Sequence, residues 1–334
     1  MATARPSTRC APPVRKSSRT RPAWARSLCA LLLALPQALL AAPYAYVPNE
    51  GSGTVSIIDT GTDTVVAELA AGKKPRGTAV SLDARWLYVS DQPNNRLVLI
   101  DLSARREAGS VPLGESPEGV GMSPDGRWVA AAIEESNDVA FVDTRDNRKA
   151  FVVTVRGKNP EHAVFSPNGR LVFVSAEEGE AVDIIDVGQR KEIAQVPVGA
   201  RPRGIGFLPD GSRAYVAAEN ANHVYVLDAV NFKVITRIKA GVRCNGIAVH
   251  PSGKWVYVSN GGDGTVSVID TASNAIIATI PVGKRPWNMA LTPDAKKLYV
   301  ANGRSNSVSV IDTEKNERLR DVSVGAKPWG VVVR

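Results

Sequence analysis

Short apolar runs alternate with turn residues along most of the chain. Between residues 245 and 280 there are four such runs, 245–249, 255–259, 265–270 and 275–280, each rich in Val, Ile, Thr or aromatic residues. Turn segments such as Pro251-Ser-Gly separate them. Runs of this length between Gly, Pro, Asn and Asp clusters are typical of β-strands, and no window shows a helical period. The pattern therefore predicts an all-β protein.

The four runs belong to a unit that occurs seven times. Its third run ends in aspartate, at intervals of 42 residues in five steps and 43 in one: Asp59, Asp101, Asp143, Asp186, Asp228, Asp270 and Asp312. A glycine followed three residues later by proline keeps the same interval, as in Gly72 and Pro75, except that Cys244 replaces the fifth proline. Seven units of this length with four strands each predict a seven-bladed β-propeller with four-stranded antiparallel blades.

The two ends of the repeat array complement each other. The array begins in mid-unit at Tyr44, and residues 329–333 supply one additional first strand. We expect this C-terminal strand to close the first blade, because closure hides sheet edges that would otherwise promote aggregation. Residues 43–334 are predicted to form one domain.

Residues 1–42 have the layout of a secretory signal peptide, with a basic start, an apolar run at 28–40 and Ala41-Ala42 at its end. They contain seven of the 41 Lys and Arg residues and no acid, which leaves 34 bases against 33 acids. The formal charge of +8 is therefore not a sign of polyanion binding. Cys244 is the only cysteine beyond this segment, so no internal disulfide is expected. We predict a periplasmic or secreted protein with no membrane span after cleavage.

Four tetrapeptides carry a family resemblance. They are Tyr46-Val-Pro-Asn, Tyr88-Val-Ser-Asp, Tyr257-Val-Ser-Asn and Tyr299-Val-Ala-Asn, which resemble the name-giving motif of the YVTN β-propeller family. The resemblance covers residues 44–334 and looks most like the exported subgroup found alongside pyrroloquinoline-quinone-dependent alcohol catabolism. That subgroup implies a secreted seven-bladed propeller with an accessory role and no assigned reaction.

The repeated aspartates are expected to be structural, because a carboxylate at a strand end can accept backbone N–H groups and cap the following turn. His162, His223 and His250 show no metal-binding spacing. No nucleophile motif, phosphate loop or dinucleotide fingerprint occurs. We therefore expect no catalytic residue, no metal and no cofactor that is recognisable from a motif.

The turns into each inner strand open on the central channel of a propeller. The residue after the proline of this turn varies most among the repeats, and the next is mostly glycine, with His162 and Asn288 as exceptions. Variable loop positions on a constant frame favour binding. The predicted ligand-binding residues are Arg76, Glu118, Glu161, His162, Arg203, Arg243, Asn245, Arg285, Trp287 and Trp329.

The charges of the turn segments indicate which class of ligand these residues would bind. The Gly-x-x-Pro-x segments contain ten bases against three acids, and Trp287 and Trp329 come from adjacent repeats. Arginines beside aromatic faces suit a planar anion. Neighbouring loops on the same face carry acids, including Glu50, Glu134 and Glu177, so a face with a basic and an acidic side is expected. Glu118 and Glu161 occupy matched positions in adjacent blades and are expected to approach each other.

Three functions remain open from the sequence. The first is a non-catalytic accessory propeller that binds a small anionic molecule or a periplasmic partner protein, such as a quinoprotein dehydrogenase or its cytochrome. The second is an enzyme of lactonase or lyase type that uses His162 with Glu161 or Glu118 as acid and base. The third is a single-stranded nucleic-acid-binding propeller, which a net charge of +1 over the predicted mature chain disfavours.

Overall fold

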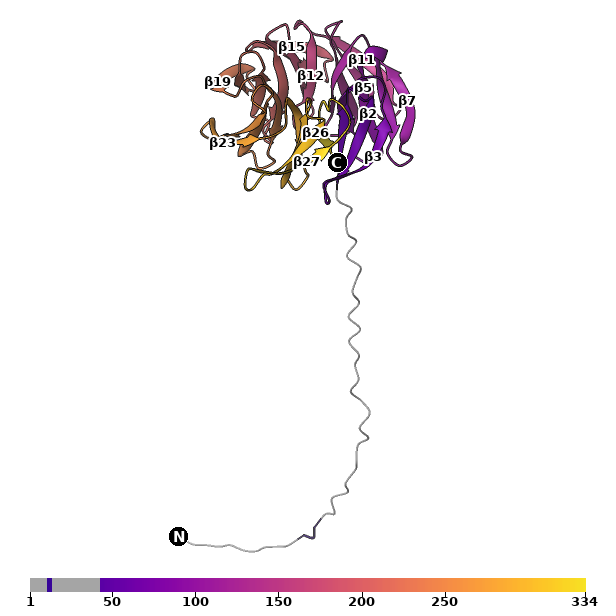
Figure 1. Cartoon of the computed structure of the whole chain (residues 1–334), viewed down its shortest axis with the longest axis vertical. Coiled ribbons are helices and arrows are strands. Elements are labelled where there is room, and N and C mark those ends of the chain that lie inside the picture. Colours follow the sequence, from indigo (N-terminus) through magenta and orange to yellow (C-terminus); the bar gives the residue numbers. More distant parts are fainter. Residues whose placement is uncertain (1–10, 14–42) are drawn as a thin grey trace, which may run out of the picture. The chain divides into compact units, whose positions relative to one another are not determined.

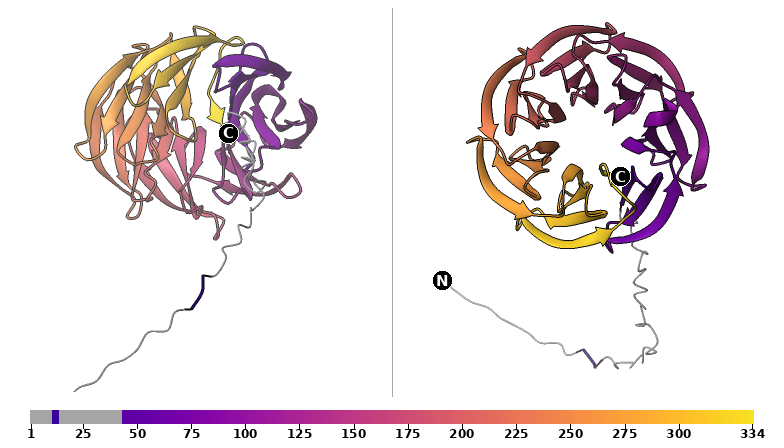
Figure 2. Two further views of the ribbon diagram at one scale, coloured as in Figure 1. Left: turned by 90° about the horizontal axis from the view of Figure 1, so that it is seen from below. Right: turned by 45° about the horizontal axis from the view of Figure 1, so that its top comes forward.

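Seven four-stranded antiparallel sheets are arranged in a ring around a central channel (Figure 2). The computed structural model describes residues 11–13 and 43–334, and the predicted signal peptide lies outside the described residues apart from 11–13. The predicted fold class, with seven blades and four strands in each, is confirmed. Within the described ranges, no helix has the length and hydrophobicity that crossing a bilayer requires.

Each blade runs from an inner strand at the channel to an outer strand at the rim (Figures 1 and 2). Blade 1 contains β28 (Val332–Val333), β1 (Tyr44–Asn49), β2 (Thr54–Asp59) and β3 (Thr64–Ala70). Blade 2 contains β4 (Pro75–Val80), β5 (Trp86–Asp91), β6 (Arg96–Asp101) and β7 (Arg106–Pro112), with the 3-10 turn η1 (Gln92–Asn94) after β5. Blade 3 contains β8 (Pro117–Met122), β9 (Trp128–Ile133), β10 (Asp138–Asp143) and β11 (Arg148–Thr154). Blade 4 contains β12 (Pro160–Phe165), β13 (Leu171–Ala176), β14 (Ala181–Asp186) and β15 (Lys191–Pro197).

The remaining blades repeat the pattern. Blade 5 contains β16 (Pro202–Phe207), β17 (Arg213–Ala218), β18 (His223–Asp228) and β19 (Lys233–Lys239). Blade 6 contains β20 (Cys244–Val249), β21 (Trp255–Asn260), β22 (Thr265–Asp270) and β23 (Ala275–Pro281). Blade 7 contains β24 (Pro286–Leu291), β25 (Lys297–Asn302), β26 (Ser307–Asp312) and β27 (Glu317–Ser323).

The ring closes within blade 1, as the ends of the array predict. Val332 and Val333 of β28 pair with Tyr46 and Ala45 of β1. The Trp329 N–H donates to Pro48 O at 2.9 Å, and Arg334 exchanges backbone hydrogen bonds with Tyr44. Figure 2 shows the C-terminus inside the ring beside the first strands of the propeller.

The core consists of apolar layers between neighbouring blades. One layer packs Ala132 and Phe141 of blade 3 against Val172 and Ile185 of blade 4. The tyrosines of the YVTN-like motifs lie in these layers, and Tyr88 is fully buried with its hydroxyl donating to Asn147 Oδ1 of the next blade at 2.8 Å. Tyr88 thus fills a layer with its ring and satisfies its hydroxyl across it.

The repeated polar residues are structural, as expected. Asp59 Oδ1 accepts the N–H groups of Gly61 and Thr62 at 2.8 and 3.0 Å and thereby caps the turn to the outer strand. The last residue of the YVTN-like motif is buried under the turn into the inner strand, and a Cβ on Gly325 would approach Asn49 Cγ to 2.6 Å. A side chain at Gly325 would therefore clash with Asn49, which explains the glycine at this position of the repeat.

Candidate functional site

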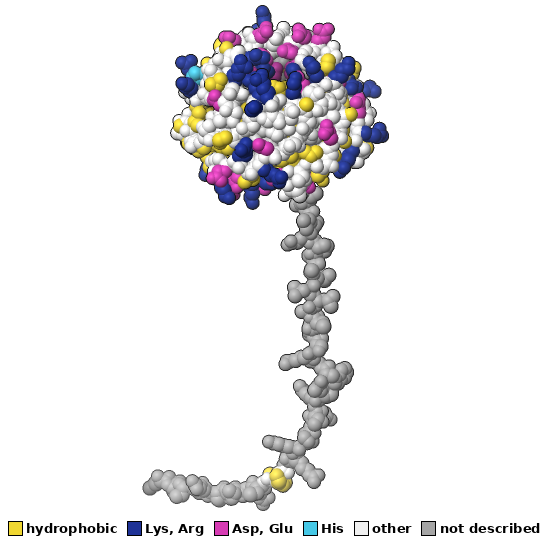
Figure 3. Space-filling view, in the orientation of Figure 1, with side chains coloured by type: hydrophobic (Ala, Val, Ile, Leu, Met, Phe, Trp, Pro, Cys, Tyr) yellow, Lys and Arg dark blue, Asp and Glu magenta, His cyan; other side chains and the backbone are white. Residues whose placement is uncertain are grey.

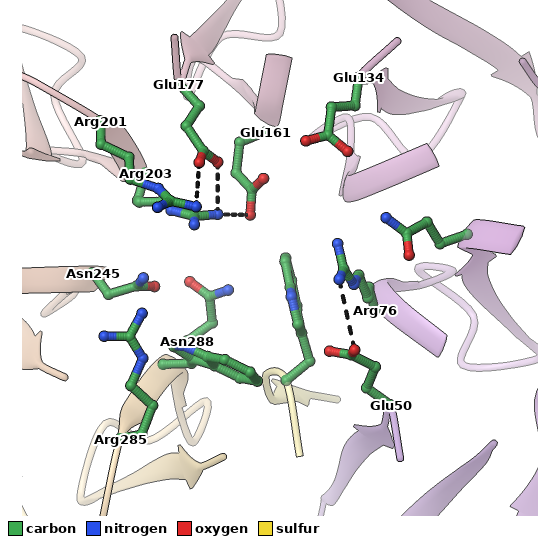
Figure 4. Close-up of a pocket in the computed structure, with 13 residues that line it drawn as sticks. Glu50, Arg76, Glu134, Glu161, Glu177, Arg201, Arg203, Asn245, Arg285 and Asn288 are labelled. Atoms are coloured by element: carbon green, nitrogen blue, oxygen red, sulfur yellow. Dashed lines mark ion pairs between the residues drawn. The ribbon is translucent and has the colours of Figure 1, made fainter. Parts of the chain in front are cut away.

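A cavity of about 250 Å³ lies at one mouth of the channel. It is lined by Glu50, Arg76, Gln92, Glu134, Glu161, Glu177, Arg201, Arg203, Asn245, Arg285, Trp287, Asn288 and Trp329. Two kinds of segment build it, the starts of the inner strands and the loops that follow strands β1, β5, β9 and β13. Figure 4 shows the labelled side chains converging on the cavity.

Six of the seven variable turn residues line this cavity, from Arg76 of β4 to Trp329 before β28. The seventh, Glu118, is fully buried and bonded to Arg76. The glycine that follows these residues allows adjacent inner strands to approach, because a Cβ on Gly204 would lie 2.6 Å from Asn245 O. Sequence reasoning thus located the cavity because the repeat fixes which residue of each inner strand meets the channel mouth.

Arg203 is the centre of an ion-pair cluster on one wall. Its Nη1 contacts Glu161 Oε1, and lies 3.0 Å from Glu177 Oε2. Its Nε donates to Glu219 Oε2 at 3.0 Å. Arg201 pairs with Glu177, and Arg285 Nη2 donates to Glu219 Oε1 at 2.6 Å. Three guanidinium groups therefore share three carboxylates.

A second cluster on the opposite wall is built around Arg76. Its Nη1 donates to the buried Glu118, and its Nη2 lies 3.6 Å from Glu50 Oε1. Gln92 Nε2 also donates to Glu118 Oε1, at 2.8 Å. Glu134 Oε2 accepts only the hydroxyl of Ser116, at 2.8 Å. This wall has one guanidinium group for three carboxylates.

The positive charge expected from the turn segments is not found inside the cavity. Of the ten bases in those segments, only Arg76, Arg203, Arg201 and Arg285 line it, and each is paired with a carboxylate. The six others are exposed and lie outside the lining: Lys73, Lys74, Lys158, Arg243, Lys284 and Lys327. Figure 3 shows Lys and Arg side chains gathered on the upper face with acidic side chains among them. The count along the sequence missed much of the pairing because three of the acidic partners, Glu50, Glu177 and Glu219, come from other loops.

The carboxyl groups differ in acidity. Burial raises the pKa of Glu118 to about 8, and repulsion from Glu161 adds to it, so the two matched glutamates do interact as expected. Burial also raises the pKa of Glu177 to about 7, against the attraction of Arg203. For Glu161 burial is the largest influence and acts in the same direction, but the attraction of Arg203 together with His162 and Arg76 outweighs it, and the pKa lies below its ordinary value. The cavity therefore contains both a carboxyl group whose pKa is lowered and one that titrates near neutrality.

Two indole rings form the apolar part of the lining. The Trp329 ring stacks on His162 with a centroid distance of 5.3 Å and an interplanar angle of 19°. Asn288 Nδ2 lies 3.1 Å from His162 Nε2, so side chains of blades 7 and 4 meet across the channel. His162 and Asn288 are the two exceptions to the glycine rule, and their contact explains why a side chain is accepted there.

His162 is placed behind the lining rather than in it. Its Nδ1 is buried without a partner among the described residues, and burial lowers the pKa of the imidazole to about 4. The ring is therefore neutral at physiological pH, and it supports Trp329 from behind. The lining of the cavity contains Glu161 but not His162, so the imidazole is not placed to exchange a proton with a molecule in the cavity.

Asn245 has a different position. It is 4% exposed, its side chain points into the cavity, and its amide makes no hydrogen bond to another described side chain or backbone group (Figure 4). Because this amide faces the cavity and makes no bond of its own, it is suited to bind a ligand or water there.

The sequence alone did not show which individual residues line the cavity. Nothing in the sequence distinguishes Gln92 from other loop residues, because it reaches the cavity through the 3-10 turn η1. Arg243 is one of the predicted ligand-binding residues, but its side chain is exposed and lies outside the cavity lining. Its backbone N–H donates to Asn222 Oδ1. Cys244 is fully buried, and burial raises the pKa of its thiol to about 12, so it is a packing residue.

Within the described part of the chain, no group of three or more His, Cys, Asp or Glu side chains is arranged to hold a metal ion. The carboxylates at the cavity are instead held apart by guanidinium groups.

Comparisons with known proteins agree with the fold. A family model described as a seven-bladed β-propeller lactonase matches residues 186–324. No curated protein matches the chain. The chain is similar in structure to hydrazine synthase of Kuenenia stuttgartiensis, with 23% identity, a TM-score of 0.74 and coverage of 80% of this chain and 92% of that one.

Two further solved structures are similar. One is a protein of unknown function from Desulfotomaculum acetoxidans, with 18% identity, a TM-score of 0.76 and coverage of 87% and 99%. The other is a candidate 6-phosphogluconolactonase of Bacteroides uniformis, with 21% identity, a TM-score of 0.73 and coverage of 87% and 99%. Likeness at these identities establishes the fold. Together these findings identify the fold as a seven-bladed β-propeller, in a chain that is similar in sequence to the seven-bladed β-propeller lactonase family over residues 186–324.

Proposed function

We propose that this protein is a non-catalytic binding propeller that holds a small polar molecule at the channel mouth. The observation that carries the proposal is the cavity of about 250 Å³, which is lined by six of the seven positions at which the repeats differ most. Asn245 offers an unpartnered amide inside it, and Trp329 offers a ring next to several carboxylates and guanidinium groups. Enclosed sites with a few convergent polar groups are typical of small-molecule binding.

The biological setting of the proposal is an exported accessory role in pyrroloquinoline-quinone-dependent alcohol catabolism. It is supported by the YVTN-like motifs and by the signal-peptide-like residues 1–42. A quinoprotein dehydrogenase or its cytochrome is the expected partner in this setting. Capture of such a protein by the purified propeller from periplasmic extract, and its loss in a Trp329→Ala variant, would support a role of the channel mouth in that contact.

The binding proposal is tested by tryptophan fluorescence. Small polar compounds, including pyrroloquinoline quinone and aldonolactones, are titrated into the protein while emission is followed. A bound molecule at the cavity changes emission in the wild type and not in the double variant Trp287→Phe/Trp329→Phe, because both indole rings line the cavity. Trp86→Phe is the matched control, because Trp86 packs in an inter-blade layer away from the cavity and its loss leaves the response intact. A response that persists in the double variant contradicts the site.

Lactone hydrolysis is a second candidate function. Glu177 favours it, because a carboxyl group with a pKa near 7 can both donate and accept a proton at neutral pH, and it lies beside Arg203, which could stabilise an oxyanion. The lactonase family match over residues 186–324 also favours it. Turnover on an aldonolactone panel that falls at least 100-fold in Glu177→Gln, with Glu178→Gln unchanged, would support it. Turnover that is the same in both variants would exclude Glu177 as the proton-transfer group.

A further inference from the structure

We propose that the cavity selects a small organic cation, such as a primary amine or a quaternary ammonium compound, over an anion. This inference rests on the proposed binding function and names the class of its ligand. It replaces the anionic ligand that the count of bases along the sequence favours. Its basis is the placement of charges around the cavity, together with the indole rings that line it.

Carboxylates outnumber guanidinium groups at the cavity. Four arginines line it, and six glutamates either line it or bond directly to those arginines: Glu50, Glu118, Glu134, Glu161, Glu177 and Glu219. All four arginines are engaged by these carboxylates. An incoming anion would have to displace a buried carboxylate from its partner, whereas a cation can approach Glu50 and Glu134, neither of which forms an ion pair shorter than 3.6 Å.

The carboxylates with the fewest contacts lie on one wall. Glu134 accepts one hydroxyl hydrogen bond, and Glu50 has Arg76 at 3.6 Å as its ion-pair partner. Figure 4 shows these two side chains on either side of Arg76, facing the cavity. Both can accept hydrogen bonds from an ammonium group without first losing a short ion pair. This wall is where we place the positive end of the ligand.

The other groups of the cavity fit an organic rather than an inorganic cation. No metal-binding cluster occurs among residues 43–334, and the least engaged carboxylates are separated by the Arg76 guanidinium. Trp329 supplies an aromatic ring, and such rings attract ammonium groups through their negative faces. Asn245, which is only 4% exposed, can bind a polar group at the far end of the ligand.

The test compares probes of different charge on one protein. Choline is the cationic probe, pyrroloquinoline quinone the anionic probe and glucono-δ-lactone the neutral probe, each followed by calorimetry and by tryptophan fluorescence. We expect choline to bind at least tenfold more tightly than either other probe. Glu134→Gln should weaken choline binding roughly tenfold, because it removes the least engaged carboxylate. Glu135→Gln is the matched control, since Glu135 is the next residue, is exposed and lies outside the lining.

The outcomes separate the ligand class from the binding function. Tighter binding of the quinone or the lactone, abolished by Trp329→Phe, overturns the cationic class and leaves the binding function standing. Binding of none of the three probes up to millimolar concentration, or choline binding that is the same in wild type, Glu134→Gln and Trp329→Phe, overturns both. Equal melting temperatures of the variants and the wild type show that any loss of binding is not a loss of fold.

Discussion

Removal of Arg203 should destabilise the protein in a manner that depends on pH. The Arg203 side chain is 13% exposed and contacts Glu161, Glu177 and Glu219, of which Glu219 is fully buried. Removal of one partner from a buried ion-pair cluster costs about 3–5 kcal/mol, because the remaining charges lose their compensation. Arg203→Leu is therefore expected to lower the free energy of unfolding by about 3–5 kcal/mol at pH 7.5.

The sign of the pH dependence follows from the carboxyl groups. In the wild type the pKa values of Glu161 and Glu219 lie below the ordinary value, since arginines outweigh burial, so their stabilising contribution is present above pH ~4.3 and is lost on acidification. Without Arg203, burial acts with less opposition and raises these pKa values. The variant then loses stability as the pH rises through the raised values. The difference in the free energy of unfolding between variant and wild type should thus be smaller at pH 4.5 than at pH 7.5.

Urea unfolding followed by circular dichroism at the two pH values measures this difference. Arg201→Leu is the matched control: Arg201 is 40% exposed and pairs mainly with Glu177, and exposed pairs contribute about 0–1 kcal/mol. The reasoning is refuted if Arg203→Leu costs less than about 1 kcal/mol at pH 7.5, or if its cost does not change with pH. Either result would mean that water enters the cluster and screens the carboxylates.

Three further predictions follow from the fold. Truncation after Lys327 removes Trp329 and β28, so it should lower the melting temperature and abolish ligand-induced fluorescence changes together; retention of either property contradicts closure by this segment. Tyr299→Phe should lower the free energy of unfolding in urea by about 1.5–3 kcal/mol, because the Tyr299 hydroxyl donates to the Asp63 carboxylate. Tyr88→Phe should lower it by about 0.5–1.5 kcal/mol, because the Tyr88 hydroxyl donates to the neutral Asn147. Equal costs would contradict this difference in acceptors. Cys244 should not react with a thiol reagent in the folded protein at pH 8 and should react fully in denaturant, since burial raises its thiol pKa to about 12; fast modification of the native protein would show that the thiol reaches solvent.

The repeat allowed the fold to be predicted almost completely, because every blade has to bury the same faces against its neighbours. Tyr88 and Asp59 have roles that recur in other blades, so an interval of 42 residues was enough to assign them. The same logic located the cavity through residues that break the repeat. It did not reveal how the charges pair, because the partners of the arginines are decided by contacts such as Arg285 to Glu219, whose residues are 66 positions apart in different blades. Such contacts depend on side-chain conformations that no interval in the sequence determines.

Trp329 connects ligand binding with the integrity of the ring. Its backbone N–H donates to Pro48 in the closing blade, and its indole lines the cavity and stacks on His162 from blade 4. A ligand that binds the closed cavity and not an opened ring must therefore stabilise the closure, by an amount that grows with its concentration relative to its dissociation constant. The strand that closes the ring has two residues in β28, and backbone hydrogen bonds that join Trp329 to Pro48 and Arg334 to Tyr44 extend its pairing with blade 1. Occupancy of the cavity and closure of the propeller are consequently coupled through one side chain.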